Sequence, residues 1–392
     1  MNVTELMLAL PIMVLGRLLR RDRNSWSIIV DKRQGFEGNL LAIAAHLAKR
    51  KGTTVYVIDC GNRGIGVDEA LGENVKFIRH HSFAELKARL RSRQVVVTHS
   101  LKPALGRYSL LNAVRIINVW HGIPVKGMGN MDQSFPRNRL AVEFKRRKAI
   151  SIFCVSSELE RTFIAACHLM DASRIHVLGI PRTDMLIDQS VMTSGQCRIH
   201  SAISAVKSGR KMVLYAPTFR EEAADSLGLT RADMERLNVL FADHDVLFAV
   251  RPHPKEAAAY DQLVAGLSHI VHADSRRWPD TNTVLLQSDA LVTDYSSIWL
   301  EYLLLNRPLA AFWWDFQKYA DHRGFLIDLE AIFPGPKAFT VPELEQCFRR
   351  WLSHGFANEP EWGLLQQQMR HLFHKHADGR SSERVVNAAT LD

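Results

Sequence analysis

Apolar positions in the sequence gather in short, continuous runs that alternate with stretches of helical periodicity. In the first half, five β-branched runs predict buried strands: 25–31, 53–59, 94–100, 115–120 and 151–156. Their continuous apolar character, without strict alternation, is typical of a parallel sheet that is covered on both faces. Helical patterns separate the runs, as in "NLLAIAAHLAKR" and "SELERTFIAACHL". Strand, helix and strand in series predict a doubly wound α/β sheet.

The pattern breaks after "HVLGIPRTDML" and then starts again. Residues 188–210 are polar and mixed, and four further strands are predicted at 211–220, 245–254, 289–297 and 307–315. The sequence therefore predicts two Rossmann-like domains of the α/β class, each built on a doubly wound parallel sheet. We place the N-terminal domain at 25–190, the C-terminal domain at 191–370 and a last helix at 371–392.

The first 24 residues have a different pattern from the rest. Residues 6–15 are nearly all apolar, and they are followed by Arg17, Arg20, Arg21 and Arg23. The run is shorter than the roughly 20 apolar residues of a membrane-spanning helix. Its charges follow the apolar run, whereas a secretory signal carries them in front. Two interpretations stay open: a helix packed on the protein's own core, or an interfacial membrane helix over 1–24.

Composition narrows the classes of partner and site. The chain has 392 residues, and its 50 Lys and Arg against 41 Asp and Glu give a formal net charge of +9. Such a balance favours an anionic partner such as a nucleotide or a membrane surface. The five cysteines are scattered, odd in number and without a CxxC pair. We therefore expect a reducing compartment, no disulfide framework and no metal.

Unusual clusters lie where the predicted strands end. In open α/β sheets the ligand crevice lies beyond the carboxyl ends of the strands. Because the clusters come from both halves of the chain, they predict a cleft between the two domains. The clusters are "WHGIPVKG", "GIPRTD", "YAPTFR", "RPHP" and "TDYSS".

Two of these clusters contain histidines. His121 lies among glycines that let a ligand approach the backbone closely, and Lys126 adds a positive charge. Arg251 and His253 lie two residues apart in an extended "RPHP" segment, so both side chains point to the same side. Each cluster also has a plainer interpretation, a structural histidine in the first and a simple turn in the second. The sharper hypothesis is a catalytic imidazole and an anion clamp.

The segment "TDYSSIWLEYLLL" carries the most specific prediction. Ser296 and Ser297 fall where a strand ends and an apolar helix begins. Free N–H groups and the helix dipole make such a position favourable for phosphate, although the serines could simply cap the helix. Glu301 follows Ser297 by one helical turn, so its carboxylate could reach a polyol hydroxyl of a ligand held there.

Arginines near two other strand ends suit a pyrophosphate. "VLYAPTFR" ends with Pro217, Thr218 and Arg220, and "GIPRTD" offers Arg182. A bidentate guanidinium is the expected partner of phosphate oxygens. The sequence contains neither GxxxxGK[ST] nor GxGxxG, so it predicts no P-loop ATPase and no nicotinamide cofactor. We expect no cofactor.

The ordered set of clusters, with "RGFLIDL…PG" and "DGRSSERV", resembles the CDP-glycerol glycerophosphotransferase family of teichoic-acid primases and polymerases. The resemblance runs from about Gly35 to Val386. The family more often has HGTP in the first motif and Leu before the lysine. This chain has Ile123 and Val125 at those positions and keeps the His, Gly, Pro and Lys.

The resemblance implies a GT-B fold, two Rossmann-like domains facing a central cleft. It implies peripheral attachment to the cytoplasmic face of the cell membrane, with no nucleic-acid partner. It also implies transfer of glycerol phosphate, or a related polyol phosphate, from a CDP-polyol donor to a lipid-linked acceptor or a growing teichoic-acid or capsule-like polymer. The functional positions that carry over are catalytic His121 and His253 and donor-binding Gly122, Pro124, Arg182, Pro217, Thr218, Arg251, Ser296, Ser297 and Glu301.

The resemblance also suggests a mechanism in which the acceptor hydroxyl attacks the β-phosphorus and CMP leaves. His121 would be the general base, while His253, Arg251 and the helix start at Ser296 and Ser297 would stabilise the phosphate charge. Alternatives stay open: a GT-B glycosyltransferase that uses a nucleotide sugar, a ribitol-specific enzyme, or a lipid-carrier binding protein without activity. The length of the chain favours a primase over a polymerase.

Overall fold

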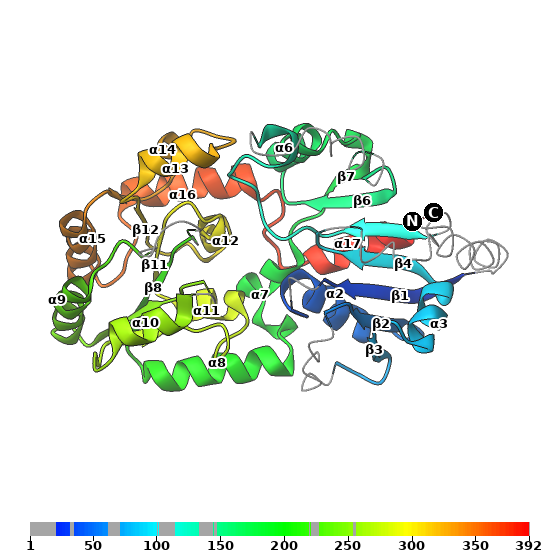
Figure 1. Ribbon diagram of the computed structural model, residues 1–392, viewed down its shortest axis with the longest axis horizontal. Coiled ribbons are helices and arrows are strands. Elements are labelled where there is room, and N and C mark those ends of the chain that lie inside the picture. Colours follow the sequence, from blue (N-terminus) through cyan, green and yellow to red (C-terminus); the bar gives the residue numbers. More distant parts are fainter. Residues whose placement is uncertain are drawn as a thin grey trace. The chain divides into compact units, whose positions relative to one another are not determined.

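The computed structural model describes residues 21–31, 35–61, 71–99, 101, 114–132, 144, 147–218, 220, 227–253 and 256–391. The chain forms two compact units (Figure 1). Unit 1 comprises residues 1–122, 134–195 and 374–392, and unit 2 comprises residues 123–133 and 196–373. The segment predicted as an interfacial helix lies outside the described residues up to Arg20.

Unit 1 is built on a seven-stranded sheet in which all strands pair in parallel. The strands in spatial order are β3 (Val75–Arg79), β2 (Thr54–Asp59), β1 (Asp22–Val30), β4 (Ser92–Val97), β5 (Arg115–Asn118), β6 (Ile150–Val155) and β7 (Ile175–Val177). Its helices are α2 (Gly38–Ala48), α3 (Phe83–Arg91), α6 (Glu158–His168), α7 (Asp184–Ile187) and α17 (Ser381–Thr390).

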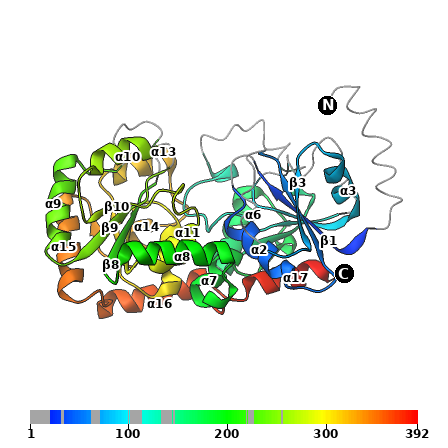
Figure 2. The same ribbon diagram turned by 90° about the horizontal axis from the view of Figure 1, so that it is seen from below.

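The core of unit 1 follows from the alternation of side chains along the strands. Trp26, Ile28 and Val30 of β1 are buried in one cluster with apolar residues of α2 and α17. These two helices lie side by side (Figure 2), although they come from opposite ends of the chain. Helix α3 packs against β1 and β3. The sheet is thus buried by helices, as its continuous apolar runs predict.

Unit 2 repeats this design with a six-stranded parallel sheet. Its strands in spatial order are β10 (Ile270–His272), β9 (Val246–Val250), β8 (Lys211–Ala216), β11 (Ala290–Thr293), β12 (Leu309–Phe312) and β13 (Lys337–Ala338). Its helices are α8 (Ser194–Lys207), α9 (Arg231–Ala242), α10 (Ala257–Val264), α11 (Thr281–Gln287), α12 (Ile298–Tyr302), α13 (Phe316–Arg323), α14 (Leu329–Ile332), α15 (Val341–Ser353) and α16 (Pro360–Phe373). Helix α8 begins two residues before unit 2.

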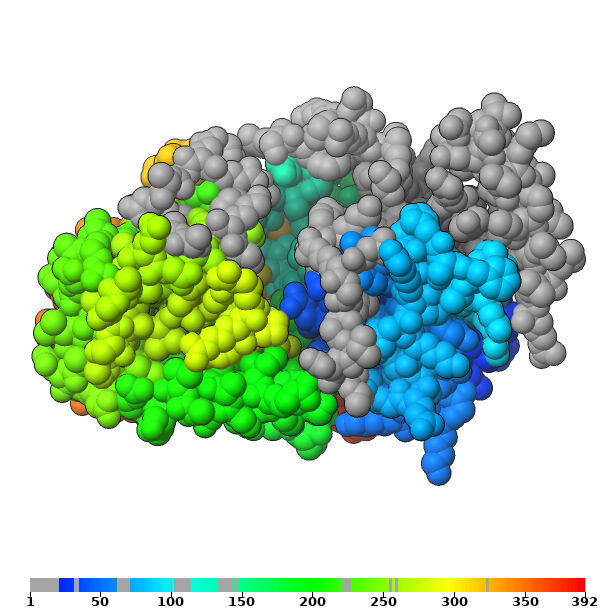
Figure 3. All heavy atoms as spheres, turned by 60° about the horizontal axis from the view of Figure 1, so that its bottom comes forward, coloured from blue at the N-terminus to red at the C-terminus, as the bar shows by residue number. Residues whose placement is uncertain are grey.

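The core of unit 2 lies between its sheet and helices α9 and α15. Phe248 of β9 stacks on Phe241 of α9, with ring centroids 5.3 Å apart, and Phe348 of α15 contacts both rings. Figure 3 shows a face of unit 2 that is formed by the residues of helix α8 (green) and of the region around α10 (yellow-green). The α/β class with two doubly wound parallel sheets, predicted from the sequence, is confirmed.

Four short strands did not appear in the sequence pattern: β3, β7, β10 and β13. Three of them span only two or three residues, too few for a periodicity to show. Strand β1, which lies between β2 and β4 in the sheet, begins at Asp22, three residues before the predicted strand. Arg21, predicted to lie in an interfacial helix, is 9% exposed and donates to the carbonyls of Arg89 and Ser92 at 2.6 and 2.9 Å. Arg21 therefore satisfies backbone carbonyls at the C-terminal end of α3.

Candidate active site

In unit 1 the candidate site is a tight turn after strand β5. Trp120 has a left-handed backbone conformation with φ of 50°, and Gly122 follows with φ of 143°. The Trp120 N–H donates to the Asn118 side chain at 2.9 Å. The indole ring packs on Phe153, with ring centroids 5.4 Å apart, and on His168 at 5.2 Å. This turn presents His121 at the carboxyl end of the sheet, where the sequence predicted a ligand site.

The His121 ring lies flat on the ring of His99, with centroids 4.0 Å apart and planes 2° from parallel. His121 is solvent-exposed, yet the surrounding protein removes enough water to lower its pKa, and the charges of His99 and Arg182 lower it further. A hydrogen bond to the Thr98 backbone raises the pKa, which identifies the Thr98 carbonyl as the acceptor. The imidazole is therefore neutral at pH 7, with one nitrogen donating to Thr98.

Arg182 lies in the same unit, on the 3₁₀ turn Pro181–Thr183. Its backbone N–H donates to the side-chain oxygen of Asn39 at 3.0 Å. Its side chain passes over the start of α2, because a Cβ placed on Gly38 would lie 3.4 Å from the Arg182 Cδ. The structure thus brings His121 and Arg182 into one site, although 60 positions separate them in the sequence.

The motif "WHGIPVKG" is divided between the two units. His121 and Gly122 group with unit 1, whereas Pro124 and Lys126 group with unit 2. In unit 2, Lys126 forms an isolated antiparallel bridge with Phe325, and the Leu326 N–H donates to the Val125 carbonyl at 2.9 Å. These bonds hold Lys126 next to the carboxyl ends of β8 and β11.

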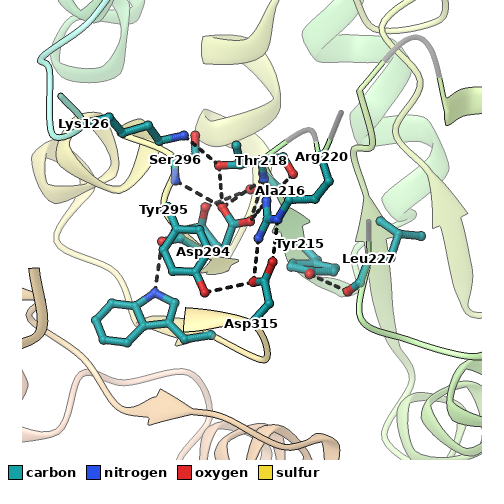
Figure 4. A network of polar contacts seen from close by, with 12 residues as sticks. Lys126, Tyr215, Ala216, Thr218, Arg220, Leu227, Asp294, Tyr295, Ser296 and Asp315 are labelled. Atoms are coloured by element: carbon teal, nitrogen blue, oxygen red, sulfur yellow. Dashed lines mark hydrogen bonds and ion pairs between the residues drawn. The ribbon is translucent and has the colours of Figure 1, made fainter. Parts of the chain in front are cut away.

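The centre of the site in unit 2 is Asp294, which is fully buried at the end of β11 (Figure 4). Its carboxylate accepts hydrogen bonds from the Thr218 N–H at 2.8 and 2.9 Å, from the Thr218 hydroxyl at 2.7 Å and from the Ser296 N–H at 3.1 Å. The Lys126 ammonium lies 3.3 Å from the Thr218 hydroxyl. Asp294 therefore brings two predicted residues, Thr218 and Ser296, and one lysine together.

Arg220 is paired with carboxylates instead of facing a ligand. Its guanidinium contacts Asp294 at 2.8 Å and Asp315 at 2.9 Å, and it lies over the rings of Tyr295 and Tyr319. Burial alone would lower the pKa of the guanidinium, but the two carboxylates raise it above its ordinary value. Burial and Asp315 likewise raise the pKa of the Tyr295 hydroxyl. These groups form a buried frame under the loop that carries Thr218.

Arg251 also has partners within the protein. Its guanidinium donates to backbone carbonyls and one hydroxyl of a single loop: Ala273 at 3.0 Å, Trp278 at 2.8 Å, Pro279 at 3.2 Å and the Thr281 hydroxyl at 3.2 Å. An arginine with these bonds orders the loop before α11. These bonds give Arg251 a structural role in this loop, and the anion clamp expected from "RPHP" stays a prediction.

The remaining predicted residues of unit 2 lie near the ends of strands. Pro217 and His253 are half-buried after β8 and β9. Helix α12 spans only five residues, and the Ser297 side chain makes no capping bond. Glu301 is 4% exposed and accepts a hydrogen bond from Asn282 at 2.9 Å. The carboxylate predicted to reach a polyol is thus held in the protein interior by α11.

Several residues of the site escaped the sequence analysis. Asp294 lies inside the quoted motif, and a carboxylate directly after an apolar strand was a signal that could have indicated it. Asp315, which follows the apolar run "LAAFWW", carries the same signal. Asn39 and His99 do not, because their importance depends on contacts between segments distant in the sequence.

A candidate metal cluster occurs among the described residues away from this site. The side chains of His80, His81 and Glu85 offer ligand atoms within 4.8 Å of one another. Glu85 already accepts the His81 N–H at 2.6 Å and pairs with Arg89 at 2.7 Å. The cluster therefore has a structural role at the start of α3, and the expectation of no metal stays a prediction. In the part of the chain that the structure describes, no helix is long and apolar enough to cross a membrane.

Two Rossmann-like units, each built on a parallel sheet with polar groups at the carboxyl ends of its strands, are the architecture of the GT-B fold. Among solved structures, the wall teichoic acid polymerase TagF matches with a TM-score of 0.80, at 18% identity, over 99% of this chain and 98% of that one. Residues 12–390 match the family described as CDP-Glycerol:Poly(glycerophosphate) glycerophosphotransferase. The chain belongs to this family.

Relatives with assigned names cover both kinds of polyol. The teichoic acid poly(ribitol-phosphate) polymerase of Bacillus spizizenii is 27% identical over 277 residues, which are 69% of this chain and 42% of the relative. The teichoic acid ribitol-phosphate primase of the same organism is 30% identical over 239 residues, 59% of this chain and 57% of the relative. The teichoic acid poly(glycerol phosphate) polymerase of Bacillus subtilis is 26% identical over 292 residues, 69% of this chain and 36% of the relative. The chain spans about half the length of these relatives.

Proposed function

We propose that the protein transfers a polyol phosphate from a CDP-polyol to a hydroxyl of a lipid-linked acceptor or a growing polymer. The observation that carries this proposal is the exposed His121 ring at the end of β5, which stacks on the His99 ring with centroids 4.0 Å apart. Desolvation by the surrounding protein lowers the pKa of this ring, and one of its nitrogens donates to the Thr98 carbonyl. The second ring nitrogen is then a proton acceptor on an exposed side chain. Membership of the glycerophosphotransferase family supplies the substrate class.

The reaction follows from this assignment. The acceptor oxygen forms a bond to the β-phosphorus, and the bond between that phosphorus and the oxygen of CMP breaks. His121 takes the proton of the attacking hydroxyl, and CMP leaves with the electron pair of the broken bond. A neutral imidazole suits this step at pH 7. Phosphoryl transfer needs mainly positioning and charge stabilisation from the rest of the protein.

Lys126, Thr218 and Ser296 are our candidates for binding the donor phosphates. The Thr218 hydroxyl and the Ser296 N–H donate to the buried Asp294, and the Thr218 oxygen positions the Lys126 ammonium. The Lys126 ammonium and the Ser296 hydroxyl are the groups that would donate to the phosphate oxygens. Cations and N–H or O–H donors are the groups that stabilise phosphate oxygens. Arg182 supplies a further cation in unit 1. We assign Arg251 and Glu301 to positioning, because the structure gives both of them bonds inside the protein.

The His121→Ala variant tests the general base. We expect kcat for CMP release to fall by roughly 10² to 10⁴, because a positioned base contributes that much to rate. Donor affinity should change little, since the base acts on the acceptor. The matched control is His176→Ala, an imidazole on β7 of unit 1. Wild-type turnover in the His121 variant would refute the assignment.

Donor identity needs a direct comparison. Purified protein is incubated with CDP-glycerol, CDP-ribitol or UDP-sugars and a lipid-linked acceptor, and release of CMP and UDP is measured. We expect CMP from one or both CDP-polyols, with mass spectrometry showing one polyol phosphate added to the acceptor. Release of UDP alone would favour the nucleotide-sugar alternative, and no release from any donor would favour a binding protein.

We also propose peripheral attachment to the cytoplasmic face of the cell membrane, with anionic lipid as the partner surface. The support is the sequence of the first 20 residues, which lie outside the described residues, and the net charge of +9. Basic residues near an anionic surface each contribute on the order of 1 kcal/mol to binding.

A further inference from the structure

We propose that Asn39, at the start of α2, is a positioning residue that holds the His121 turn and Arg182 in a fixed mutual arrangement. The proposal rests on the function proposed for His121. Asn39 is the second residue of α2 and is 1% exposed.

Each polar atom of the Asn39 side chain has a partner on another segment. Its amide nitrogen donates to the Val119 carbonyl at 2.9 Å and to the Trp120 carbonyl at 3.0 Å. Its oxygen accepts the Arg182 backbone N–H at 3.0 Å. One buried amide therefore joins α2, the turn after β5 and the turn after β7.

The two carbonyls show why this contact bears on His121. In an extended strand, successive carbonyls point in opposite directions, so one side chain cannot bind both. Trp120 adopts a left-handed conformation, which residues with a side chain rarely adopt, and its two flanking peptide groups meet the same amide. Asn39 thus stabilises the strained backbone from which the His121 side chain departs.

A second asparagine acts from the strand itself. The Asn118 side chain accepts the Trp120 N–H at 2.9 Å and donates to the His99 carbonyl at 3.4 Å. His99 is the ring on which His121 stacks. The turn is therefore fixed through its N–H by Asn118 and through its carbonyls by Asn39.

Helix α2 does not need Asn39 for its attachment to unit 1. Leu40, Ile43 and Leu47 of the helix are fully buried in the core cluster shared with β1 and β2. Removal of the amide should therefore leave the helix in place and release the turn. An intact helix with a released turn is the result expected of a positioning residue, whereas loss of the helix is the result expected of a general structural residue.

The test compares Asn39→Ala and Asn39→Asp with the control Asn74→Asp. The aspartate at position 39 keeps the volume and the acceptor for Arg182 but removes both N–H donors. Asn74 lies in the same unit, and its amide also donates to two backbone carbonyls, those of Thr53 and Leu47, at 3.1 and 3.5 Å. Circular dichroism establishes that the three variants are folded.

We expect both Asn39 variants to lose about 10²-fold in kcat, the cost of a small misplacement of a catalytic group. Asn74→Asp should keep wild-type turnover. The midpoint of the His121 ring titration, followed by NMR with His121→Ala for assignment, should move in both Asn39 variants toward the value of an ordinary histidine. Burial lowers this midpoint most, the charges of His99, Arg182 and His168 lower it further, and the hydrogen bond to the Thr98 backbone raises it.

The titration needs no substrate, so it separates this proposal from the proposed function. If the wild type releases CMP from none of the donors, the function fails, while the midpoint still reports on Asn39. Wild-type turnover in both Asn39 variants would overturn the proposal. An unchanged His121 midpoint in both variants would overturn it as well.

Discussion

At the scale of single residues, the site depends on aromatic rings packed in a chain. The indole of Trp120 contacts the His121 ring on one side and the His168 and Phe153 rings on the other. Such contacts add packing energy and fix ring orientation. They give a physical reason for a tryptophan in a left-handed backbone conformation, since the ring contacts of the half-buried indole offset the cost of the backbone.

The packing of these rings can be tested through His168, a buried histidine with a lowered pKa. It is 6% exposed, neither ring nitrogen has a partner among the described residues, and burial lowers its pKa to about 3. The unfolded chain binds a proton near pH 6.5 and the folded protein does not, so stability is lost as pH falls below 6.5. The loss is about 1.4 kcal/mol per pH unit for this one group.

We therefore expect the wild type to lose more stability than His168→Phe between pH 6.5 and 4.5. The difference should be about 2.3 kcal/mol, because the phenyl ring fills the same space without a titratable group. Urea unfolding at a series of pH values measures it. Parallel pH dependence in the two proteins would contradict a neutral His168 in the folded state.

At the scale of elements, a buried carboxylate holds the start of helix α17 in place. The Asp184 carboxylate accepts the N–H groups of Ser381 and Ser382, each at 2.8 Å. A carboxylate at a helix N-terminus satisfies free N–H groups and interacts with the helix dipole. Gly179 lies against the same serine, since a Cβ there would be 2.3 Å from the Ser381 hydroxyl. The "DGRSSERV" motif therefore attaches the start of α17 to the segment that contains Gly179 and Asp184.

Asp184→Ala should destabilise unit 1 by roughly 2 to 4 kcal/mol, because two buried N–H groups lose a charged acceptor. Hydrogen exchange of the α17 amides should become faster. The control is Asp188→Ala, an exposed aspartate of the same segment whose side chain accepts only a local bond from Ser190. Equal stability of the two variants would show that the helix start needs no carboxylate.

At the scale of the whole molecule, we predict that the proposed membrane attachment is separable from folding. Deletion of residues 1–20 keeps Arg21, which bonds to the carbonyls after α3, and keeps β1 intact. We expect the shortened protein to keep its melting temperature and to lose binding to anionic liposomes. Binding of the full chain should weaken as salt rises, since exposed charges are screened.

Co-sedimentation with liposomes and thermal melting measure these two outcomes. Liposomes of neutral lipid serve as the control surface. A lower melting temperature with unchanged liposome binding would show that the segment packs on the protein, which is the other interpretation that the sequence left open.

The sequence by itself determined the elements and the class of protein. Runs such as 151–156 predicted β6, and the pattern at 39–50 predicted α2, because periodicity depends on burial along one segment. The ordered motifs indicated the family, which the match over residues 12–390 confirms. They also pointed to His121 as the candidate base, which stays a prediction.

Only the tertiary structure decided which partners the polar groups of the motifs have within the protein. Arg251 and Glu301 have the charge of ligand-binding residues, yet their bonds go to a loop carbonyl set and to Asn282. Asn39 and Asp294 carry no such expectation, yet Asn39 organises the His121 turn in unit 1 and Asp294 organises the Thr218 loop in unit 2. The physical reason is that a hydrogen bond depends on where distant segments meet, and that information lies in the packing of helices on sheets, not in any single stretch of sequence.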